Sequence, residues 1–139
     1  MTTAADLTIE GNEVTLFELP QFESNLDAIR RKGGIELLGA ANEGISMPES
    51  LTTDAEQAVT GADLIVQVVP NFGYQSFAEA VAPHLEADVP LVLTSANTLG
   101  AVEYRKFLRD AGAPAVRLGE APSLAYNVRK EGPATVDVI

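Results

Sequence analysis

The chain has 139 residues, of which 46% are hydrophobic and 21% charged, a composition that suits a compact domain with its own core. It contains no cysteine and a single histidine, so disulfides, thiolate metal sites and multi-histidine metal centres are excluded, and we expect no bound metal. The net charge of −11 argues against nucleic acid or an anionic membrane as a partner. The sequence has neither an apolar run long enough to span a membrane nor the basic start of a signal peptide, so a cytoplasmic location is expected.

Short β-rich runs alternate with helical stretches along the first half of the chain. The expected elements are a helix at 2–10, a strand at 13–19, a helix at 21–32, strands at 35–40 and 44–48, and a short helix that is capped by Thr52 or Thr53 and ends near Gly61. The helix at 21–32 places Phe22, Leu26 and Ile29 on one face. Its last turn carries three basic residues, which suits the helix dipole.

The alternation continues through the second half. We expect strands at 63–69, 90–94, 116–119 and 135–139, with helices at 75–85 and 101–111. The almost wholly apolar run at 63–69 is typical of a central parallel strand that is buried on both faces. This pattern predicts an α/β fold with a doubly wound, mostly parallel sheet, in which ligands bind outside the carboxyl ends of the strands.

Glu18 stands at the carboxyl end of the first expected strand. In a dinucleotide-binding fold, an acid at this position accepts hydrogen bonds from ribose hydroxyls. The alternative is an ordinary strand-end carboxylate in an acidic protein. The Gly-x-Gly-x-x-Gly turn that should precede such an acid by about 20 residues does not occur in the 139 residues.

Residues 2–10 read like the remainder of the helix that this glycine turn would open. We therefore expect the chain to begin inside the first βαβ unit, without the first strand and its phosphate loop. In a doubly wound sheet that strand is central, so its loss would separate the strands at 13–19 and 63–69. We expect these two strands to pair directly, the alternative being that 135–139 or a strand of a second chain fills the gap.

Four segments carry a resemblance to a known family. They are GNEVTLFE at 11–18, LTTD at 51–54 with AVTGADLI at 58–65 and VP at 69–70, GAVEYR at 100–105, and EAPSLAYNVR at 120–129 followed by Gly132 and Pro133. In this order they resemble the nucleotide domain of the NAD/NADP octopine/nopaline (opine) dehydrogenases. Ala121 and Ala125 depart from that pattern, in which Thr and Pro are usual. Ketopantoate reductases and 6-phosphogluconate-type dehydrogenases share much of it.

The resemblance implies that residues 1–139 form a partial Rossmann-like NAD(P)-binding domain, and that the helical catalytic domain of the family is absent from this chain. The cofactor would contact Glu18, Val69, Pro70 and Asn97, the last of these lying near the nicotinamide. NAD is preferred over NADP because Glu18 would repel a 2′-phosphate. The full-length parent would transfer hydride to or from the C–N bond of an N-(carboxyalkyl) amino acid, with an amino acid and a keto acid as substrates.

Several alternatives stay open. Asn97 also suits a plain turn residue, and Tyr126 with Arg129 suits either an inter-domain cleft or structural packing. His84 is interpreted as a solvent-facing residue near a helix end, so no catalytic residue is assigned and the chain alone is expected to be inactive. The competing functions are a fragment of a ketopantoate reductase or 6-phosphogluconate-type dehydrogenase, and a non-catalytic binding fragment. The sequence decides neither these nor whether the protein forms a homodimer.

Overall fold

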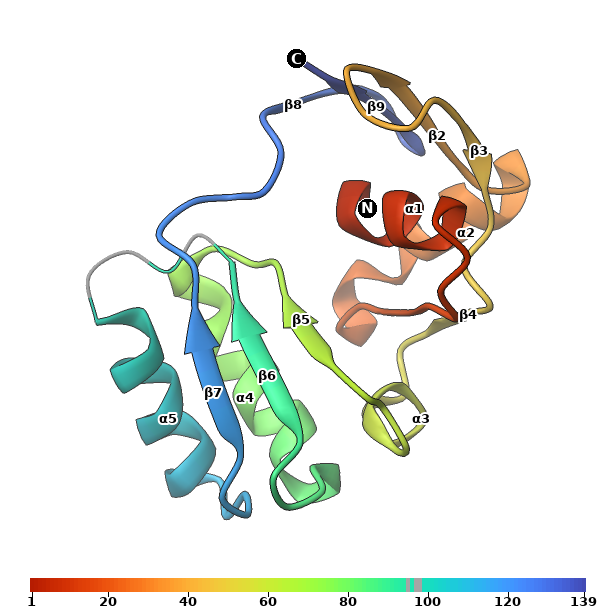
Figure 1. Cartoon of the computed structure of the whole chain (residues 1–139). Helices are drawn as coiled ribbons and strands as arrows, with labels where there is room; N and C mark the ends of the chain where they lie inside the picture. Colours follow the sequence, from red (N-terminus) through yellow and green to blue (C-terminus); the bar gives the residue numbers. More distant parts are fainter. Residues whose placement is uncertain (95, 97–98) are drawn as a thin grey trace. The chain divides into compact units, whose positions relative to one another are not determined.

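The computed structural model describes residues 1–94, 96 and 99–139, which divide into two compact units (Figure 1). Unit 1 comprises Met1–Asp54 and Ala125–Ile139, and unit 2 comprises Ala55–Leu124. Both units combine helices with strands, and four of the six strand pairs among the described residues are parallel, so the predicted α/β class is confirmed.

Unit 1 is built from the beginning and the end of the chain. Its elements are α1 (Thr2–Ile9), β1 (Thr15–Phe17), η1 (Pro20–Phe22), α2 (Glu23–Lys32), β2 (Ile35–Gly39), β3 (Gly44–Ser46), β4 (Ser50–Thr52), β8 (Val128–Gly132) and β9 (Thr135–Val138). One sheet has the strand order β3-β2-β9-β8, with β2 and β9 parallel and the outer strands antiparallel to their neighbours. In a separate sheet, β1 pairs in parallel with β4.

Apolar side chains from both ends of the chain form the core of unit 1. Ala5 of α1, Ile29 of α2, Leu37 of β2 and Val136 of β9 belong to one buried cluster. The parallel β2–β9 pair, in which Leu37 lies opposite Val136, brings these residues together. The C-terminal strand is thus an integral part of this unit.

Helix α2 shows how local sequence sets the element boundaries. Pro20 starts the 3-10 turn η1, so Phe22 precedes α2 and is 46% exposed, and its predicted place on the buried face is wrong. Leu26 and Ile29 are fully buried, as expected from their spacing. The helix ends at Gly33, whose φ of 81° is left-handed and whose N–H donates to the carbonyls of Ile29 and Arg30.

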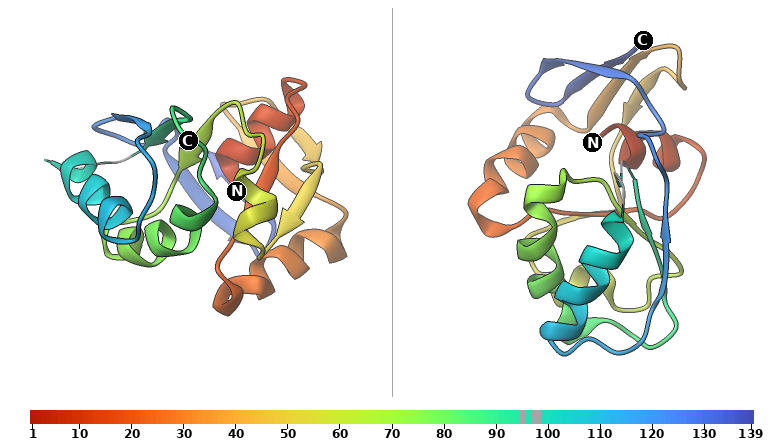
Figure 2. Two further views of the ribbon diagram at one scale, coloured as in Figure 1. Left: turned by 90° about the horizontal axis from the view of Figure 1, so that it is seen from below. Right: turned by 90° about the vertical axis from the view of Figure 1, so that its left-hand side faces the viewer.

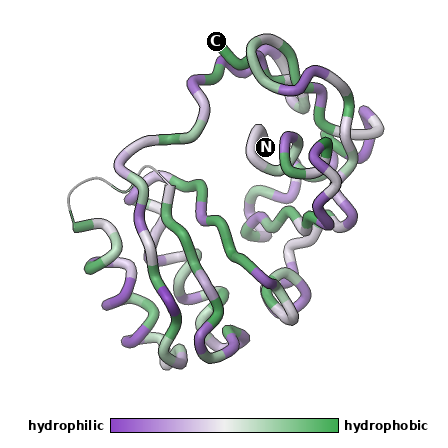
Figure 3. Tube along the Cα trace, viewed as in Figure 1, coloured by the Kyte–Doolittle hydropathy of each residue, from purple (hydrophilic) through white to green (hydrophobic). Residues whose placement is uncertain are grey.

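Unit 2 is one continuous segment with a parallel sheet of strand order β5-β6-β7. Its elements are α3 (Ala55–Val59), β5 (Ile65–Gln67), η2 (Asn71–Gly73), α4 (Tyr74–Val81), η3 (Ala82–His84), β6 (Pro90–Leu93), α5 (Gly100–Asp110) and β7 (Arg117–Glu120). Helices α4 and α5 lie side by side along the sheet (Figure 2). Figure 3 shows the apolar character of β5 and β6.

The predicted position of the strand at 63–69 is wrong. Strand β5 is shorter and lies at an edge of its sheet, where Leu64 is 51% and Val68 41% exposed. The predicted direct pairing of the strands at 13–19 and 63–69 is also wrong, because β1 pairs with β4 and β5 with β6. Residues 135–139 do not fill the gap either, since β9 pairs with β2 and β8. An apolar run identifies a strand but does not choose its neighbours.

Candidate functional site

Glu18 directly follows β1, at the carboxyl end of that strand. Its backbone N–H donates to the Thr52 carbonyl at 3.1 Å, which extends the pairing with β4 and fixes the position of Glu18. The side chain is half-buried, and Asn25 of α2 donates to Oε1 at 3.3 Å. Burial raises the pKa of Glu18, while the Asn25 hydrogen bond and the positive charges of the Met1 amino group and Lys130 oppose this shift. The structure therefore places Glu18 at the carboxyl end of a strand, as the sequence predicts.

Val69 and Pro70 follow β5, at the carboxyl end of the sheet in unit 2. Val69 is half-buried and Pro70 is exposed. The Pro70 carbonyl accepts a hydrogen bond from the Gly73 N–H at 2.8 Å, which closes the turn that leads into α4. Phe72, which is 91% exposed, adds an aromatic ring to this apolar edge. Glu18 lies in unit 1 and these residues in unit 2, each at the end of a parallel strand.

Asn97 lies outside the described residues, whereas Thr94 and Ala96, which precede it in the chain, are bound to neighbouring strands. Thr94 donates to the Gln67 carbonyl through its N–H at 2.9 Å and its Oγ1 at 3.2 Å. The Ala96 N–H donates to the Ala121 carbonyl at 3.0 Å. The carboxyl ends of β5, β6 and β7 are thus joined along one edge of unit 2.

Glu120 at the end of β7 makes a contact with α5 that the sequence did not predict. Its Oε2 accepts a hydrogen bond from the Ala101 N–H at 2.7 Å and so satisfies a free donor in the first turn of α5. Its place at the end of an expected strand could have marked Glu120 in the sequence, as it did for Glu18. Its helix partner could not be chosen from the sequence, because the two residues meet only through the packing of α5 on β7.

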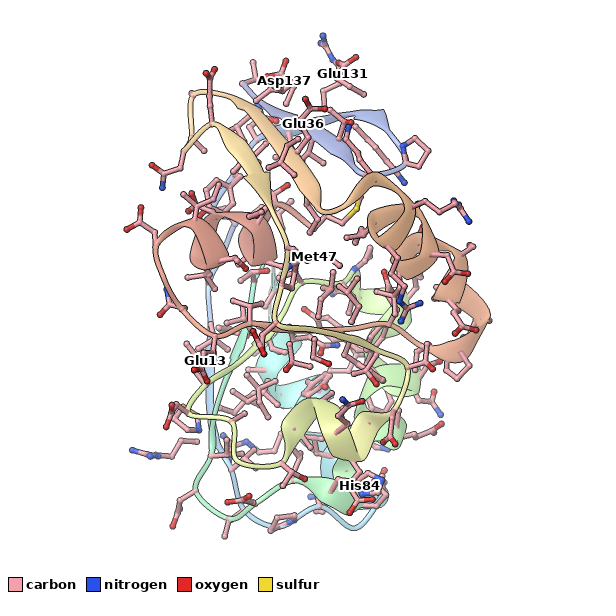
Figure 4. The ribbon with its side chains drawn as sticks, turned by 90° about the vertical axis from the view of Figure 1, so that its right-hand side faces the viewer. Glu13, Glu36, Met47, His84, Glu131 and Asp137 are labelled. Carbon is pink, nitrogen blue, oxygen red and sulfur yellow. The ribbon has the colours of Figure 1, made fainter. Side chains whose placement is uncertain are left out.

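His84 belongs to the opposite end of unit 2. His84, labelled in Figure 4, closes η3, which follows α4 (Tyr74–Val81) along the chain. An eight-residue helix is about 12 Å long, which separates His84 from the carboxyl ends of the strands. The geometry gives His84 no access to a ligand bound at that edge.

Tyr126 has a structural role in unit 1. Its hydroxyl donates to Asp6 Oδ2, and its ring packs against the core of this unit. The hydrogen bond to Asp6, together with burial, raises the pKa of Tyr126 to about 12. Arg129 on β8 is exposed. Of the two alternatives for this pair, the structure favours packing for Tyr126.

A hollow of about 230 Å³ lies elsewhere on unit 1, at the end of α2. Its lining consists of Ala28, Arg31, Lys32, Pro133, Ala134 and Thr135. The Lys32 ammonium group already donates to Glu36 and Thr135, and the C-terminal end of a helix disfavours anions. The hollow therefore does not suit a phosphate group. Among the described side chains, no three His, Asp or Glu residues gather to hold a metal ion, and no helix in this part of the chain could cross a membrane.

Comparisons with known proteins define the class and then the relatives of this chain. No family model matches it. An octopine dehydrogenase structure with NADH and L-arginine superimposes with a TM-score of 0.77 at 26% identity, over 99% of this chain and 36% of that one. A ketopantoate reductase from Ralstonia eutropha gives a TM-score of 0.67 at 23% identity, over 95% and 40%. The fold is thus that of the Rossmann-like domains of NAD(P)-dependent dehydrogenases.

The sequence relatives include glycerol-3-phosphate dehydrogenases, one of which, from Streptomyces griseus, is 37% identical over 68% of this chain and 30% of that protein. An opine dehydrogenase of Arthrobacter sp. (strain 1C) is 34% identical over 135 residues, which are 97% of this chain and 37% of that protein. The chain is therefore related to the N-terminal domain of the opine dehydrogenases over nearly its whole length, and the resemblance predicted from the sequence is confirmed. It spans a little over a third of the length of this relative. A yersinopine dehydrogenase with bound NADP⁺ shares the fold, with a TM-score of 0.76 at 17% identity over 99% of this chain and 35% of that one.

Proposed function

We propose that this chain forms the dinucleotide-binding part of an NAD(P)-dependent oxidoreductase of the opine dehydrogenase type. The observation that carries the proposal is the position of Glu18, a half-buried acid at the carboxyl end of parallel strand β1, in a chain related to opine dehydrogenases. Its carboxylate would accept hydrogen bonds from the adenosine ribose hydroxyls. Val69, Pro70 and Asn97 would provide further cofactor contacts.

The role of this chain is to bind and orient the dinucleotide, while the nicotinamide supplies the hydride chemistry. The substrate would be an N-(carboxyalkyl) amino acid, or the amino acid and keto acid from which it forms. The acid–base step falls to other residues, since His84 lies at the far end of α4 from the carboxyl edge. The chain alone is expected to be inactive.

We further propose a preference for NAD over NADP. The Glu18 carboxylate suits two free hydroxyls and would repel the additional phosphate of NADP. Solved relatives are described with NADH and with NADP⁺, so the family uses both dinucleotides. The local charge at Glu18 is what favours NAD here.

Exchanging the charge at Glu18 tests this preference. Glu18→Arg is expected to weaken NADH binding and to strengthen NADPH binding relative to it, both followed by NMR titration of the ¹⁵N-labelled chain. Glu23→Arg makes the same charge change in the first turn of α2 and serves as the control. An unchanged ratio of NADH to NADPH affinity in Glu18→Arg would show that this acid does not read the ribose.

A ketopantoate reductase remains the second candidate, and the observation behind it is the shared fold. Its identity of 23% supports the fold alone, whereas the opine dehydrogenase relative reaches 34% over almost the entire chain. The opine dehydrogenase type is therefore preferred.

A further inference from the structure

Tyr74 is a buried tyrosine next to two segments of unit 2, which are the turn between β5 and α4 and the start of α5. Tyr74 is the first residue of α4 and is fully buried. It directly follows the turn made by Pro70 and Gly73. The Val69 side chain packs over that turn, because its Cγ2 lies 3.6 Å from where a Cβ of Gly73 would be. The position of Tyr74 therefore depends on the same loop that carries Val69 and Pro70.

The Tyr74 ring lies against α5. Tyr104 of α5 contacts it edge-on, with ring centroids 5.4 Å apart and an interplanar angle of 87°. A Cβ at Gly100 would lie 3.5 Å from Tyr74 Cε2 and 2.9 Å from the Ala96 Cβ. The first residue of α5 is therefore packed between the Tyr74 ring and Ala96.

Two hydrogen bonds hold Ala101, at the start of α5, and Ala96 to β7 and the segment after it. The Ala101 N–H donates to Glu120 and the Ala96 N–H to the Ala121 carbonyl. Ala96 and Ala101 are thus held by hydrogen bonds, and Gly100 packs against the Tyr74 ring. The Tyr74 and Tyr104 hydroxyls are buried and find no hydrogen-bond partner among the described residues, so within this part of the chain the rings carry the contact.

We infer that Tyr74 is a positioning residue, whose ring sets the β5–α4 turn and the start of α5 at a fixed separation. The inference rests on the proposed function, in which Val69 and Pro70 of this turn, and Asn97 before α5 in the chain, would contact the cofactor. Tyr74 itself does not touch the cofactor, because its side chain is fully buried.

Amide hydrogen exchange of the 139-residue chain without ligand tests the inference. Tyr74→Leu is expected to speed exchange of the Ala96 and Ala101 amides about tenfold more than exchange in the second half of α5, since local opening follows lost local packing. Tyr74→Phe keeps the ring and should retain the original rates. Leu108→Ala removes buried packing further along α5 and should not single out these two amides.

Gly100→Ala alters the same contact from the α5 side. It provides the test if Tyr74→Leu does not fold. Its new methyl group would press on Ala96 and the Tyr74 ring, so the same two amides should exchange faster while the rest of α5 is unchanged. Uniform acceleration throughout unit 2, or unchanged Ala96 and Ala101 amides in both variants, would overturn the inference. Titration of the unmodified chain with NADH tests the proposed function separately, so the two can fail independently.

Discussion

Glu18 and Glu120 are carboxylates at the ends of parallel strands, and they differ in what they bind. Glu18 is half-buried and receives one hydrogen bond from the Asn25 side chain. Glu120 is exposed and accepts from the Ala101 backbone N–H in the first turn of α5. Glu120 thus holds a helix, whereas Glu18 is the carboxylate that we propose for the ribose.

The burial of Glu18 predicts a measurable pH dependence. Because its pKa is raised in the folded chain, the folded state binds more protons than the unfolded state just above the ordinary carboxyl range. Stability therefore falls as the pH rises through this window. Glu18→Gln should be more stable than the original chain at neutral pH, by less than about 1 kcal/mol.

Urea unfolding across the pH range measures this difference, which should disappear once Glu18 is protonated in both states. Glu23→Gln controls for the loss of one negative charge from a chain of net charge −11. Equal stabilisation by both variants would mean that overall charge repulsion, rather than burial of Glu18, is responsible.

At the scale of elements, the sequence predicted most of the helices and strands, but it did not predict which strands pair with one another. The spacing of Leu26 and Ile29 predicted the buried face of α2. Strand β4 was missed because Ser50–Thr52 is too short to show a period, and β8 because Val128–Gly132 is largely charged and exposed. The edge position of β5 depends on which strands pair, and no local pattern encodes that choice.

Alanine substitutions at two glycines of unit 1 compare the cost of backbone strain with the cost of a steric collision. Gly33 and Gly39 have similar φ values, 81° and 87°, but a Cβ at Gly33 meets open space while one at Gly39 would collide with the Val138 carbonyl of β9. Gly33→Ala should cost about 1 kcal/mol, and Gly39→Ala more than about 3 kcal/mol because the β2–β9 pair must separate. Chemical denaturation of the two variants provides the comparison, and similar losses would show that β9 is not held against β2 at Gly39.

At the scale of the whole molecule, every tyrosine is expected to ionise late. Burial raises the pKa of Tyr74 and Tyr104, and the bond to Asp6 raises that of Tyr126 to about 12. The chain has no other tyrosine and no tryptophan. Near-ultraviolet absorption of the folded chain should show little phenolate at about pH 10.5, where an unfolded chain is more than half ionised.

The same bond makes stability sensitive to alkali. The Tyr126–Asp6 contribution is complete below the ordinary tyrosine pKa of 10.0 and is lost as the pH rises towards about 12. Tyr126→Phe should remove this part of the alkaline loss at a cost of about 1 kcal/mol at neutral pH. Early ionisation of one phenol in the folded chain, absent in Tyr126→Phe, would contradict the Asp6 contact.

The central claim is the proposal that Glu18 contacts a bound nicotinamide dinucleotide. Titration of the ¹⁵N-labelled chain with NADH, read residue by residue, tests it most directly. Because the chain has no Gly-x-Gly-x-x-Gly loop, we predict weak binding, with a Kd in the range of about 0.1 to 1 mM. Shifts should be centred on Glu18, the turn from Val69 to Gly73 and the start of α5. Submicromolar affinity would contradict the importance given to a glycine loop, and shifts confined to the hollow beside α2, or none at millimolar NADH, would contradict the site itself.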